Sequence, residues 1–284
     1  MFVAAGSFMT ITADDFNGKV AIVTGGASGI GRSETEMLAR RGCRVVLADL
    51  NQAAAETVIR GLPRPADAFC VRTDVGDSRA VEQMVAQTEE RFGGVDFLFT
   101  NAANVPLINT RDACAIDLDD AVFDEINRVI LRGVYLCAKF AGRAMVRRGG
   151  GAMVFTATTD AQVGCAGLDA YTAAKGGVIA LTRSLAAGLA RYKIRVNAIS
   201  PSFVTTPHQA TFMDDPALRS QIESLHLLPV PSPDEVAPLA VFLASAEAAC
   251  ITGSIHQVDA GYTAFKSNNV DVMKVMNTNT IKTP

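Results

Sequence analysis

A tyrosine and a lysine four residues apart, in the run Tyr-Thr-Ala-Ala-Lys at 171–175, have the types and spacing for proton chemistry. On a helix, residues i and i+4 share one face, so Tyr171 and Lys175 would be neighbours. A nearby ammonium favours phenolate, and it should lower the pKa of Tyr171 from its ordinary value of about 10. The pair is therefore a candidate general acid and base. An ordinary helix with a tyrosine and a solvated lysine would show the same spacing.

A glycine-rich turn upstream predicts a dinucleotide site. The apolar run Lys19–Val23 leads directly into Thr-Gly-Gly-Ala-Ser-Gly-Ile-Gly at 24–31, and a helical pattern follows. Because glycine has no Cβ, such a turn lets a pyrophosphate approach the N-terminus of the helix. The alternative is a glycine-rich turn without a ligand. The residues predicted to contact the cofactor here are Gly25, Ser28, Gly29, Ile30 and Gly31.

An acidic residue ends the second predicted strand and favours NAD over NADP. Asp49 follows Gly31 by 18 positions and lies in the run Val45–Leu50. A carboxylate there can accept hydrogen bonds from both ribose hydroxyls of the adenosine half, and it would repel a 2′-phosphate. The cations Arg32 and Arg44 keep NADP as the alternative. An exposed carboxylate at a strand end, without a ligand, is the other reading.

Strand and helix patterns alternate along almost the whole chain. This order predicts an α/β fold, a single Rossmann-like doubly wound parallel sheet of about seven strands with helices on both faces. The composition agrees, because 49% hydrophobic and 19% charged residues suit elements buried on both sides. Strands are expected at 19–23, 45–50, 69–73, 97–100, 153–156, 195–199 and 254–258, and helices at 31–41, 52–60, 78–92, 123–148, 168–192 and 233–246.

The same pattern predicts one domain over 18–265, with an N-terminal extension at 1–17 and a polar tail at 266–284.

A net charge of −3 without a basic run argues against nucleic-acid binding. No stretch reaches 18 apolar residues and the start is a poor secretory signal, so we expect a cytoplasmic protein that does not span a membrane. The six scattered cysteines predict reduced, buried thiols and no metal site.

Taken together, the Thr24–Gly31 turn, Asp49 and the Tyr171–Lys175 run resemble the short-chain dehydrogenase/reductase family over about residues 18–265. Further matches are Asn101-Ala102-Ala103, which is similar to the family's Asn-Asn-Ala-Gly, and Pro201–Thr206, which is similar to its Pro-Gly-x-Val-x-Thr. The resemblance implies additional cofactor contacts, with adenine for Asp74 and Val75 and with the nicotinamide carboxamide for Val204 and Thr206; Asn101 is expected at the same site.

The resemblance also implies an activity and an assembly. An enzyme of this kind interconverts a secondary alcohol and a ketone with NAD. Tyr171 would exchange the proton, while Lys175 would bind the nicotinamide ribose and lower the pKa of the tyrosine. The partner would be a small alcohol or ketone, and the chain would form a homotetramer or dimer through the long helices at 123–148 and 168–192.

Several positions depart from the family pattern. The catalytic serine expected 13 residues before the tyrosine is Thr158, with Thr159 as the alternative, and Thr158 keeps a hydroxyl that can donate to the substrate oxygen. The asparagine expected three residues before Gly133 is Ile130, which removes the usual water-linked proton relay unless Asn127 substitutes for it. Together with Ala102 and Ser202, these departures keep two alternatives open: a dinucleotide-binding protein with weak redox activity that acts as a sensor or interaction partner, or a non-redox isomerase.

The substrate is expected beyond the carboxyl ends of the strands, where a doubly wound sheet forms its ligand crevice. The loops there mix apolar and polar residues, which predicts a mainly apolar pocket with a few polar anchors. The segment at about 203–232 carries prolines and little periodicity, so we expect a mobile lid. The candidate substrate contacts are Asn104, Asp160, Val163, His208 and Phe212, with a surface-loop role as the alternative for His208.

Overall fold

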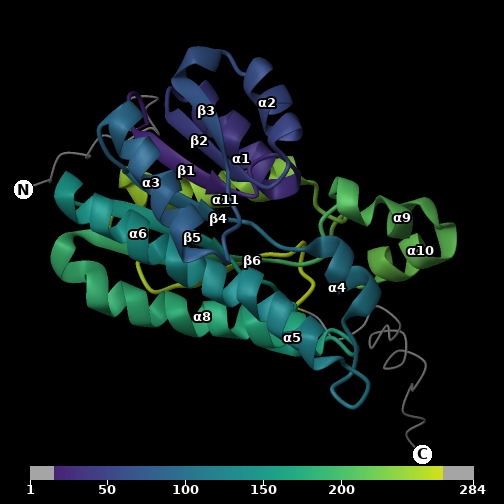
Figure 1. The fold of residues 1–284 in the computed structure, drawn as a ribbon. Coiled ribbons are helices and arrows are strands. Elements are labelled where there is room, and N and C mark those ends of the chain that lie inside the picture. The colour runs from purple at the N-terminus through teal and green to yellow at the C-terminus, as the bar shows by residue number, and fades with distance from the viewer. Residues whose placement is uncertain (1–15, 265–284) are drawn as a thin grey trace, which may run out of the picture.

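Seven short strands form one parallel sheet in the computed structural model, which describes residues 16–264 (Figure 1). Neighbouring strands all run parallel, in the order β3-β2-β1-β4-β5-β6-β7. This topology confirms the predicted doubly wound sheet. The strands are β1 (Val20–Thr24), β2 (Arg44–Asp49), β3 (Ala68–Arg72), β4 (Phe97–Thr100), β5 (Gly151–Thr156), β6 (Ile194–Pro201) and β7 (Ile255–Val258).

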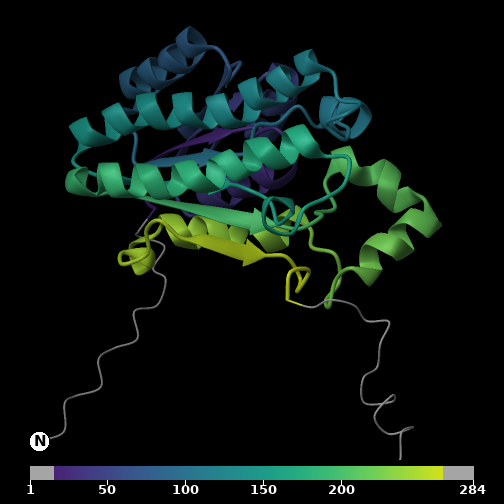
Figure 2. The ribbon, with the colours of Figure 1, turned by 90° about the horizontal axis from the view of Figure 1, so that it is seen from below.

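Helices cover both faces of the sheet (Figures 1 and 2). They are α1 (Gly29–Arg40), α2 (Gln52–Arg60), α3 (Ser78–Phe92), α4 (Val105–Arg111), α5 (Asp120–Asn127), α6 (Gly133–Arg148), α7 (Asp160–Val163), α8 (Asp169–Leu189), α9 (Ala210–Asp214), α10 (Pro216–Ser224) and α11 (Pro233–Ala244). Side chains of a strand alternate between the faces. Ile22 packs with α3, α6 and α8, whereas its neighbours Ala21 and Val23 pack with α1, α2 and α11.

The long helix expected over 123–148 begins earlier and is interrupted. It begins with α5 at Asp120, because the Asp119 carboxylate accepts a hydrogen bond from Ala121 N (2.9 Å) and caps the first turn. Between α5 and α6, residues Arg128–Arg132 form a π turn. A regular apolar period does not predict such a turn, which occurs often near functional sites.

Short helices occupy three loops that the sequence pattern left irregular: α4, α7 and the α9–α10 pair. Asn104 caps α4 by accepting from Leu107 N (3.2 Å), and Asp215 caps α10 by accepting from Ala217 N (2.8 Å). A proline lies in the first turn of both helices, where its missing N–H costs nothing. Pro216, in the segment whose prolines suggested a loop, is therefore a helix-start signal.

The two terminal segments that the sequence predicts fall almost entirely on residues that the structure does not describe. The proposed tail at 266–284 and almost all of the extension at 1–17 lie outside residues 16–264.

Cys43 and Cys137 are buried thiols as expected, but Cys114 and Cys250 are exposed. No helix in the described part of the chain is long and apolar enough to cross a membrane.

The carboxyl ends of β1, β4, β5 and β6 meet at one edge of the sheet. In Figure 2 the arrowheads of β6 and β7 point toward α9 and α10, which project beyond this edge. The glycine-rich turn leaves β1 at this edge, and the loop holding Val204 and Thr206 leaves β6 there. The fold therefore gathers the residues predicted to bind cofactor and substrate from distant parts of the chain.

Candidate active site

Tyr171 lies in the first turn of α8, and a distant aspartate holds this turn in place. The Asp112 carboxylate accepts hydrogen bonds from Ala170 N (3.1 Å) and Tyr171 N (2.9 Å). These are two of the backbone donors that a helix leaves unpaired at its start. Asp112 is a positioning residue that sequence reasoning missed. It is 59 positions from Tyr171, and no local pattern links the two.

Lys175 follows one turn later and is 4% exposed. Its Nζ donates a hydrogen bond to the carbonyl of Thr156, the last residue of β5, and lies 5.8 Å from the centre of the Tyr171 ring. Burial lowers the pKa of Lys175 to about 8, because an ammonium loses hydration in the interior. The expected pairing of phenol and ammonium on one helix face is thus present.

The prediction that this pairing lowers the pKa of Tyr171 is wrong for the protein chain alone. Burial raises the pKa of Tyr171 above its usual range, and the charge of Asp160 adds to the rise. A hydrogen bond with Thr158 opposes it only in part. The prediction overlooked burial, the largest cause of the shift, which disfavours the charged phenolate.

The two candidate threonines lie in different surroundings. The Thr158 hydroxyl opposes the rise in the pKa of Tyr171, and its Oγ1 donates to the Asp160 carboxylate (3.2 Å). The Oγ1 of Thr159 is buried and has no hydrogen-bond partner among residues 16–264. Thr158 is therefore the threonine that shares a site with Tyr171, as the spacing favoured.

The glycine-rich turn packs so closely that side chains are excluded. A Cβ on Gly31 would lie 2.3 Å from the carbonyl oxygen of Gly25, so α1 can rest on the turn only with glycine there. Gly29 has φ +51°, and a Cβ on it would lie 3.1 Å from Cγ2 of Thr206. This contact places the turn after β1 directly beside the loop after β6, as a cofactor bound along both would require.

The start of α1 and the end of β2 have the donors and acceptors that a dinucleotide needs. Ser28, the N-cap of α1, makes no side-chain capping bond, and the first turn contains no acidic residue. The backbone N–H groups of this turn are thus directed at any bound anion. Asp49 accepts hydrogen bonds from Ala27 N (3.1 Å) and Asn51 N (2.9 Å), which fix its carboxylate beside the turn. The residues fit a dinucleotide.

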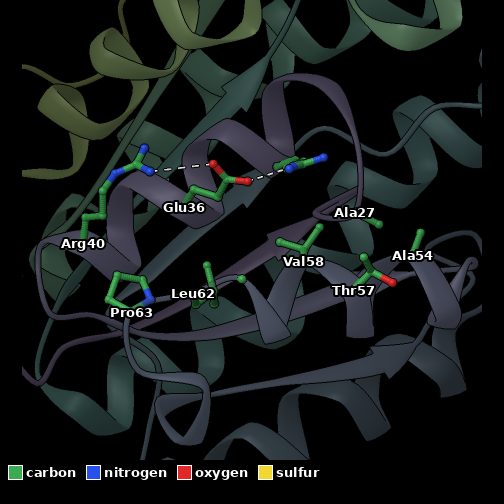
Figure 3. Close-up of a pocket in the computed structure, with 10 residues that line it drawn as sticks. Ala27, Glu36, Arg40, Ala54, Thr57, Val58, Leu62 and Pro63 are labelled. Carbon is green, nitrogen blue, oxygen red and sulfur yellow. Dashed lines mark hydrogen bonds and ion pairs between the residues drawn. The ribbon is translucent and has the colours of Figure 1, made fainter.

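The two cations that kept NADP open are both engaged elsewhere. Arg44 begins β2 and its guanidinium stacks over Phe92; it lies five positions before Asp49 along the strand, roughly 16 Å away. Arg32 donates to Glu36 (2.7 Å). Figure 3 shows the ion pair of Glu36 with Arg40 beside a cavity of about 470 Å³ between α1 and α2.

Asp74 and Val75, the predicted adenine contacts, pack against the interrupted helix. The Asp74 carboxylate accepts from the guanidinium of Arg128 in the π turn (3.0 Å). A Cβ on Gly133 would lie 2.7 Å from a methyl of Val75, so glycine at 133 lets the helix approach this loop. The helix that carries the family's relay position is therefore tied to the predicted adenine site.

Asn101 belongs to a buried polar chain that the sequence analysis did not foresee. Its Nδ2 donates to Oε2 of Glu34 (2.6 Å), and its Oδ1 accepts from Oγ1 of Thr156 (2.7 Å). Glu34 lies in α1 and is 1% exposed; burial raises its pKa to about 8, and the Asn101 bond opposes this rise. The sequence signal that could have revealed this buried polar chain is Glu34 itself, because a glutamate on the apolar face of a helix needs a buried partner. Since Lys175 bonds the carbonyl of Thr156, the chain also supports the lysine.

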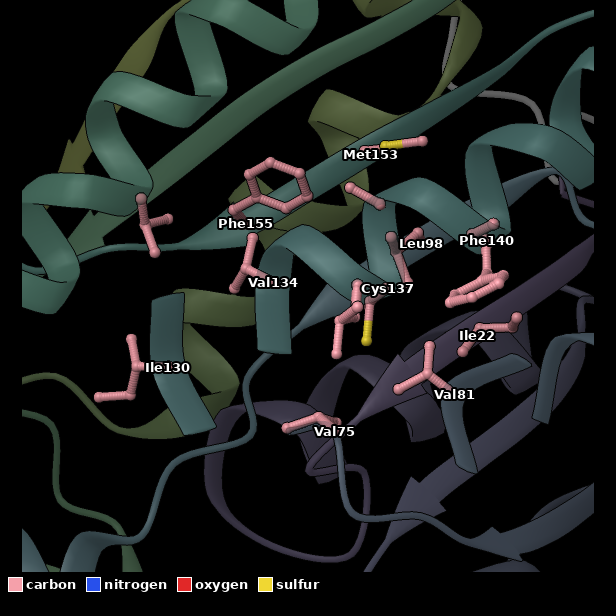
Figure 4. Packing of buried hydrophobic residues seen from close by; sticks show 14 of the residues in the cluster. Ile22, Val75, Val81, Leu98, Ile130, Val134, Cys137, Phe140, Met153 and Phe155 are labelled. Atoms are coloured by element: carbon pink, nitrogen blue, oxygen red, sulfur yellow. The ribbon is translucent and has the colours of Figure 1, made fainter. Parts of the chain in front are cut away.

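Ile130 is closed off from a polar role. It is 1% exposed and packs in the core near Val134 and Phe155 (Figure 4). Asn127 does not substitute for the missing asparagine, because its Nδ2 donates to the carbonyl of Phe123 in the preceding turn (2.9 Å). Ile130, in place of the family's asparagine, thus makes this position apolar in the structure.

The candidate substrate contacts divide into two groups. Asp160 lies beside Thr158 and Tyr171, and Phe212 packs edge-on against Phe203 near the loop after β6. His208 and Val163 are exposed, and Asn104 uses its side-chain oxygen to cap α4. Only Asp160 of the five interacts with the predicted catalytic side chains.

The lid segment is joined to the sheet edge through an unpredicted pair. His226, just after α10, is buried; its Nε2 lies 3.0 Å from Oγ of Ser202, and its Nδ1 lies 2.7 Å from the carbonyl of Ile222. Ser202 is the residue that replaces the family's glycine. Leu227 N also donates to the carbonyl of Ala260 (2.9 Å). The departure at Ser202 thus has a structural role in holding the end of the lid.

Comparison with known proteins agrees with this geometry. A family profile described as enoyl-(acyl carrier protein) reductase matches residues 25–263. The chain is 38% identical over 257 residues to 2,5-dichloro-2,5-cyclohexadiene-1,4-diol dehydrogenase of Sphingobium indicum, covering 88% of this chain and 99% of the relative. It is 39% identical over 254 residues to cis-4-hydroxycyclohexanecarboxylate dehydrogenase of Sinomonas cyclohexanicum, covering 88% and 98%.

Among solved structures, 3-ketoacyl-(acyl-carrier-protein) reductase of Brucella melitensis in complex with NADH superposes with a TM-score of 0.79 at 33% identity, covering 87% of this chain and 99% of that one. The chain belongs to the short-chain dehydrogenase/reductase family, as the order of its motifs predicted. It is an oxidoreductase of this family, and the comparisons support a nicotinamide dinucleotide as its cofactor.

Proposed function

We propose that the protein interconverts a secondary alcohol and a ketone with NAD as cofactor, and that Tyr171 is the general acid and base. The observation that carries this proposal is the hydroxyl pair of Tyr171 and Thr158 beside Lys175, at the sheet edge where the glycine-rich turn lies. A bound nicotinamide would accept or supply the hydride. Thr158 would contact the substrate oxygen, and Lys175 would stabilise the phenolate of Tyr171 by its charge.

The substrate class follows from the relatives and from the lining of the site. Both dehydrogenases named above act, by name, on hydroxylated six-membered rings. Here the segment after β6 carries the apolar Phe203–Phe212 pair, and the carboxylate of Asp160 lies beside Thr158. A ring alcohol with one further polar group would place its ring on the apolar side and that group near Asp160.

This activity can be tested with the purified protein, NAD and a panel of cyclic and open-chain secondary alcohols. We expect the near-ultraviolet absorbance of reduced nicotinamide to rise with at least one cyclic alcohol, and to fall when the matching ketone and NADH are supplied. Tight NAD binding without turnover across the panel would contradict the proposal and favour a binding role. Rearrangement of a substrate without net change in NADH would favour an isomerase.

Replacing Asp49 tests the cofactor preference. We expect wild-type protein to prefer NAD, and Asp49→Asn to lower kcat/KM for NAD about tenfold, because hydrogen bonds from the ribose to a charged group are lost. The same change should raise kcat/KM for NADP, since the carboxylate no longer repels the 2′-phosphate. Steady-state kinetics with both cofactors measure this. Asp67→Asn, which alters an ion pair with Arg64 at the other end of the sheet, is the control; equal preference in the wild type would contradict the assignment.

We further propose that the enzyme is a homo-oligomer that associates through α6 and α8. These helices form a groove of about 480 Å³ whose lining includes Val146, Leu189 and Tyr192. Val146 and Tyr192 are exposed apolar side chains that a second copy would cover. Sedimentation of the purified protein measures this, and a monomer at micromolar concentration would contradict it.

A further inference from the structure

Asp160 is a carboxylate in the active site that the proposed roles of Tyr171, Lys175 and Thr158 leave unused. It is the first residue of α7, immediately beyond β5, and it is half-buried. Its backbone N–H donates to Oγ1 of Thr158 (3.3 Å), and its Oδ2 accepts from the same hydroxyl (3.2 Å). These two bonds fix the orientation of the Thr158 hydroxyl.

The hydroxyl of Thr158 lies next to both the tyrosine and the carboxylate, as a chain for proton transfer requires. It is close enough to Tyr171 to oppose the rise in the pKa of that tyrosine, and its proton is directed at Asp160. A hydroxyl can donate and accept at once, so it can pass a proton along such a chain, which a carbonyl or an amide does poorly. Thr158 is buried, so water does not interrupt the chain at this point.

The other side of Tyr171 lacks a comparable chain. The hydrogen bond that Lys175 makes within the described residues goes to the carbonyl of Thr156. Ile130 is apolar and buried, and the amide of Asn127 is engaged by its own helix. The side-chain route toward solvent that begins at Tyr171 therefore leads through Thr158.

We propose that Asp160 is the proton acceptor for Tyr171, through the hydroxyl of Thr158, when the alcohol is oxidised. This inference rests on the proposed dehydrogenase function. As the alcohol O–H bond breaks, its proton joins the phenolate oxygen of Tyr171, and the C–H electron pair leaves as hydride to the nicotinamide. Tyr171 then gives its proton to Thr158 as Thr158 gives its own to Asp160, which releases it to water. Ketone reduction runs the same transfers in reverse.

The surroundings of Asp160 suit this task. Three titratable groups feel its charge: Tyr171 of α8, Cys165 of the loop before α8, and Tyr262 of the segment after β7. Within residues 16–264, no cation lies at ion-pair distance from Asp160, so no ion pair fixes it in the charged form. Burial raises the pKa of Asp160, and the bond from Thr158 opposes the rise. A carboxyl that gains a proton more readily than a solvated one is the better relay.

Two substitutions test the proposal in the holoenzyme with a substrate identified for the wild type. Asp160→Asn keeps an acceptor for Thr158 but cannot take a proton. We expect it to lower kcat for alcohol oxidation about 10- to 100-fold, within the range of general acid–base catalysis, and to leave KM for NAD unchanged. The kcat of Asp160→Ala should fall by a similar factor. Added formate should restore part of this kcat, whereas chloride at the same ionic strength should not.

Rescue by formate would show that a carboxylate is needed as a proton acceptor, because a merely structural role would not respond to it. A kcat for Asp160→Asn within about twofold of the wild type would overturn the proposal, as would a loss of rate that formate does not relieve in Asp160→Ala.

A readout without turnover separates this proposal from the proposed function. The ultraviolet titration of wild type minus that of Tyr171→Phe gives the pKa of Tyr171. Asp160→Asn should lower that pKa, because the negative neighbour is gone. An unchanged pKa would overturn the proposal even in an active enzyme. An inactive wild type in which the pKa does shift would contradict only the dehydrogenase function.

Discussion

Replacing Tyr171 by phenylalanine should reduce kcat by about 10²- to 10⁴-fold while NAD binding stays within about twofold. The ring remains and still packs in the first turn of α8, which Asp112 caps through backbone groups that the substitution does not touch. The hydroxyl that bonds Thr158 is lost, and with it the group placed to exchange a proton with the substrate oxygen. Steady-state kinetics give kcat, and a fluorescence titration with NADH gives cofactor affinity.

Tyr135→Phe is the matched control for this experiment. Tyr135 lies in α6, where it lines the groove proposed as the subunit interface and not the active site, so loss of its hydroxyl should leave kcat unchanged. If Tyr171→Phe turned over at a rate close to that of the wild type, Tyr171 could not be the acid–base group. If both variants lost activity equally, the effect would be on folding or assembly and not on proton transfer.

The free energy of unfolding should fall as the pH rises from about 5 to about 8.5, and Glu34→Gln should remove a large part of that fall. Burial raises the pKa of Glu34 from 4.5 to about 8 in the folded protein. Between these values the folded state holds a proton that the unfolded chain has released, so stability decreases with pH. At about 1.4 kcal/mol per pKa unit, the loss is on the order of 4 kcal/mol, a large share of a typical domain's stability.

Urea unfolding followed by far-ultraviolet circular dichroism, at both ends of this pH range, measures the effect. Glutamine has the shape of a protonated glutamate and can still accept the bond from Asn101. The control is Glu36→Gln, two positions further along α1, where the carboxylate is partly exposed and paired with Arg32. If the difference in stability between wild type and Glu34→Gln were the same at both pH values, Glu34 would not titrate as its burial implies.

The fold was predictable because each signal in it is local. The alternation of apolar runs and amphipathic stretches requires only the neighbouring residues, and α2 and α3 have the bounds that the pattern predicts. The glycine-rich turn was predictable for the same reason, since a strand, a turn and a helix follow one another directly. Asp49 followed from its place at the end of β2.

What could not be predicted depends on contacts between distant segments. Asp112 caps α8 from the end of α4, and Glu34 reaches Asn101 across 67 positions of sequence. The rise in the pKa of Tyr171 depends on burial by several elements, which a pattern of two residues does not reveal. In the segment at about 203–232 the prolines predict a loop, although Pro216 starts a helix, because proline favours both.

The cap that Asp112 places on α8 has a consequence for how the enzyme can diversify. Asp112 ends the segment after β4, one of the loops that border the substrate region, yet it holds the backbone of the residue proposed to move the proton. Loops of this kind are usually regarded as exchangeable parts on a constant scaffold. In this chain the exchange has a limit: a graft that reshapes the segment for a new substrate must also preserve the carboxylate at 112, or specificity and catalysis will change together.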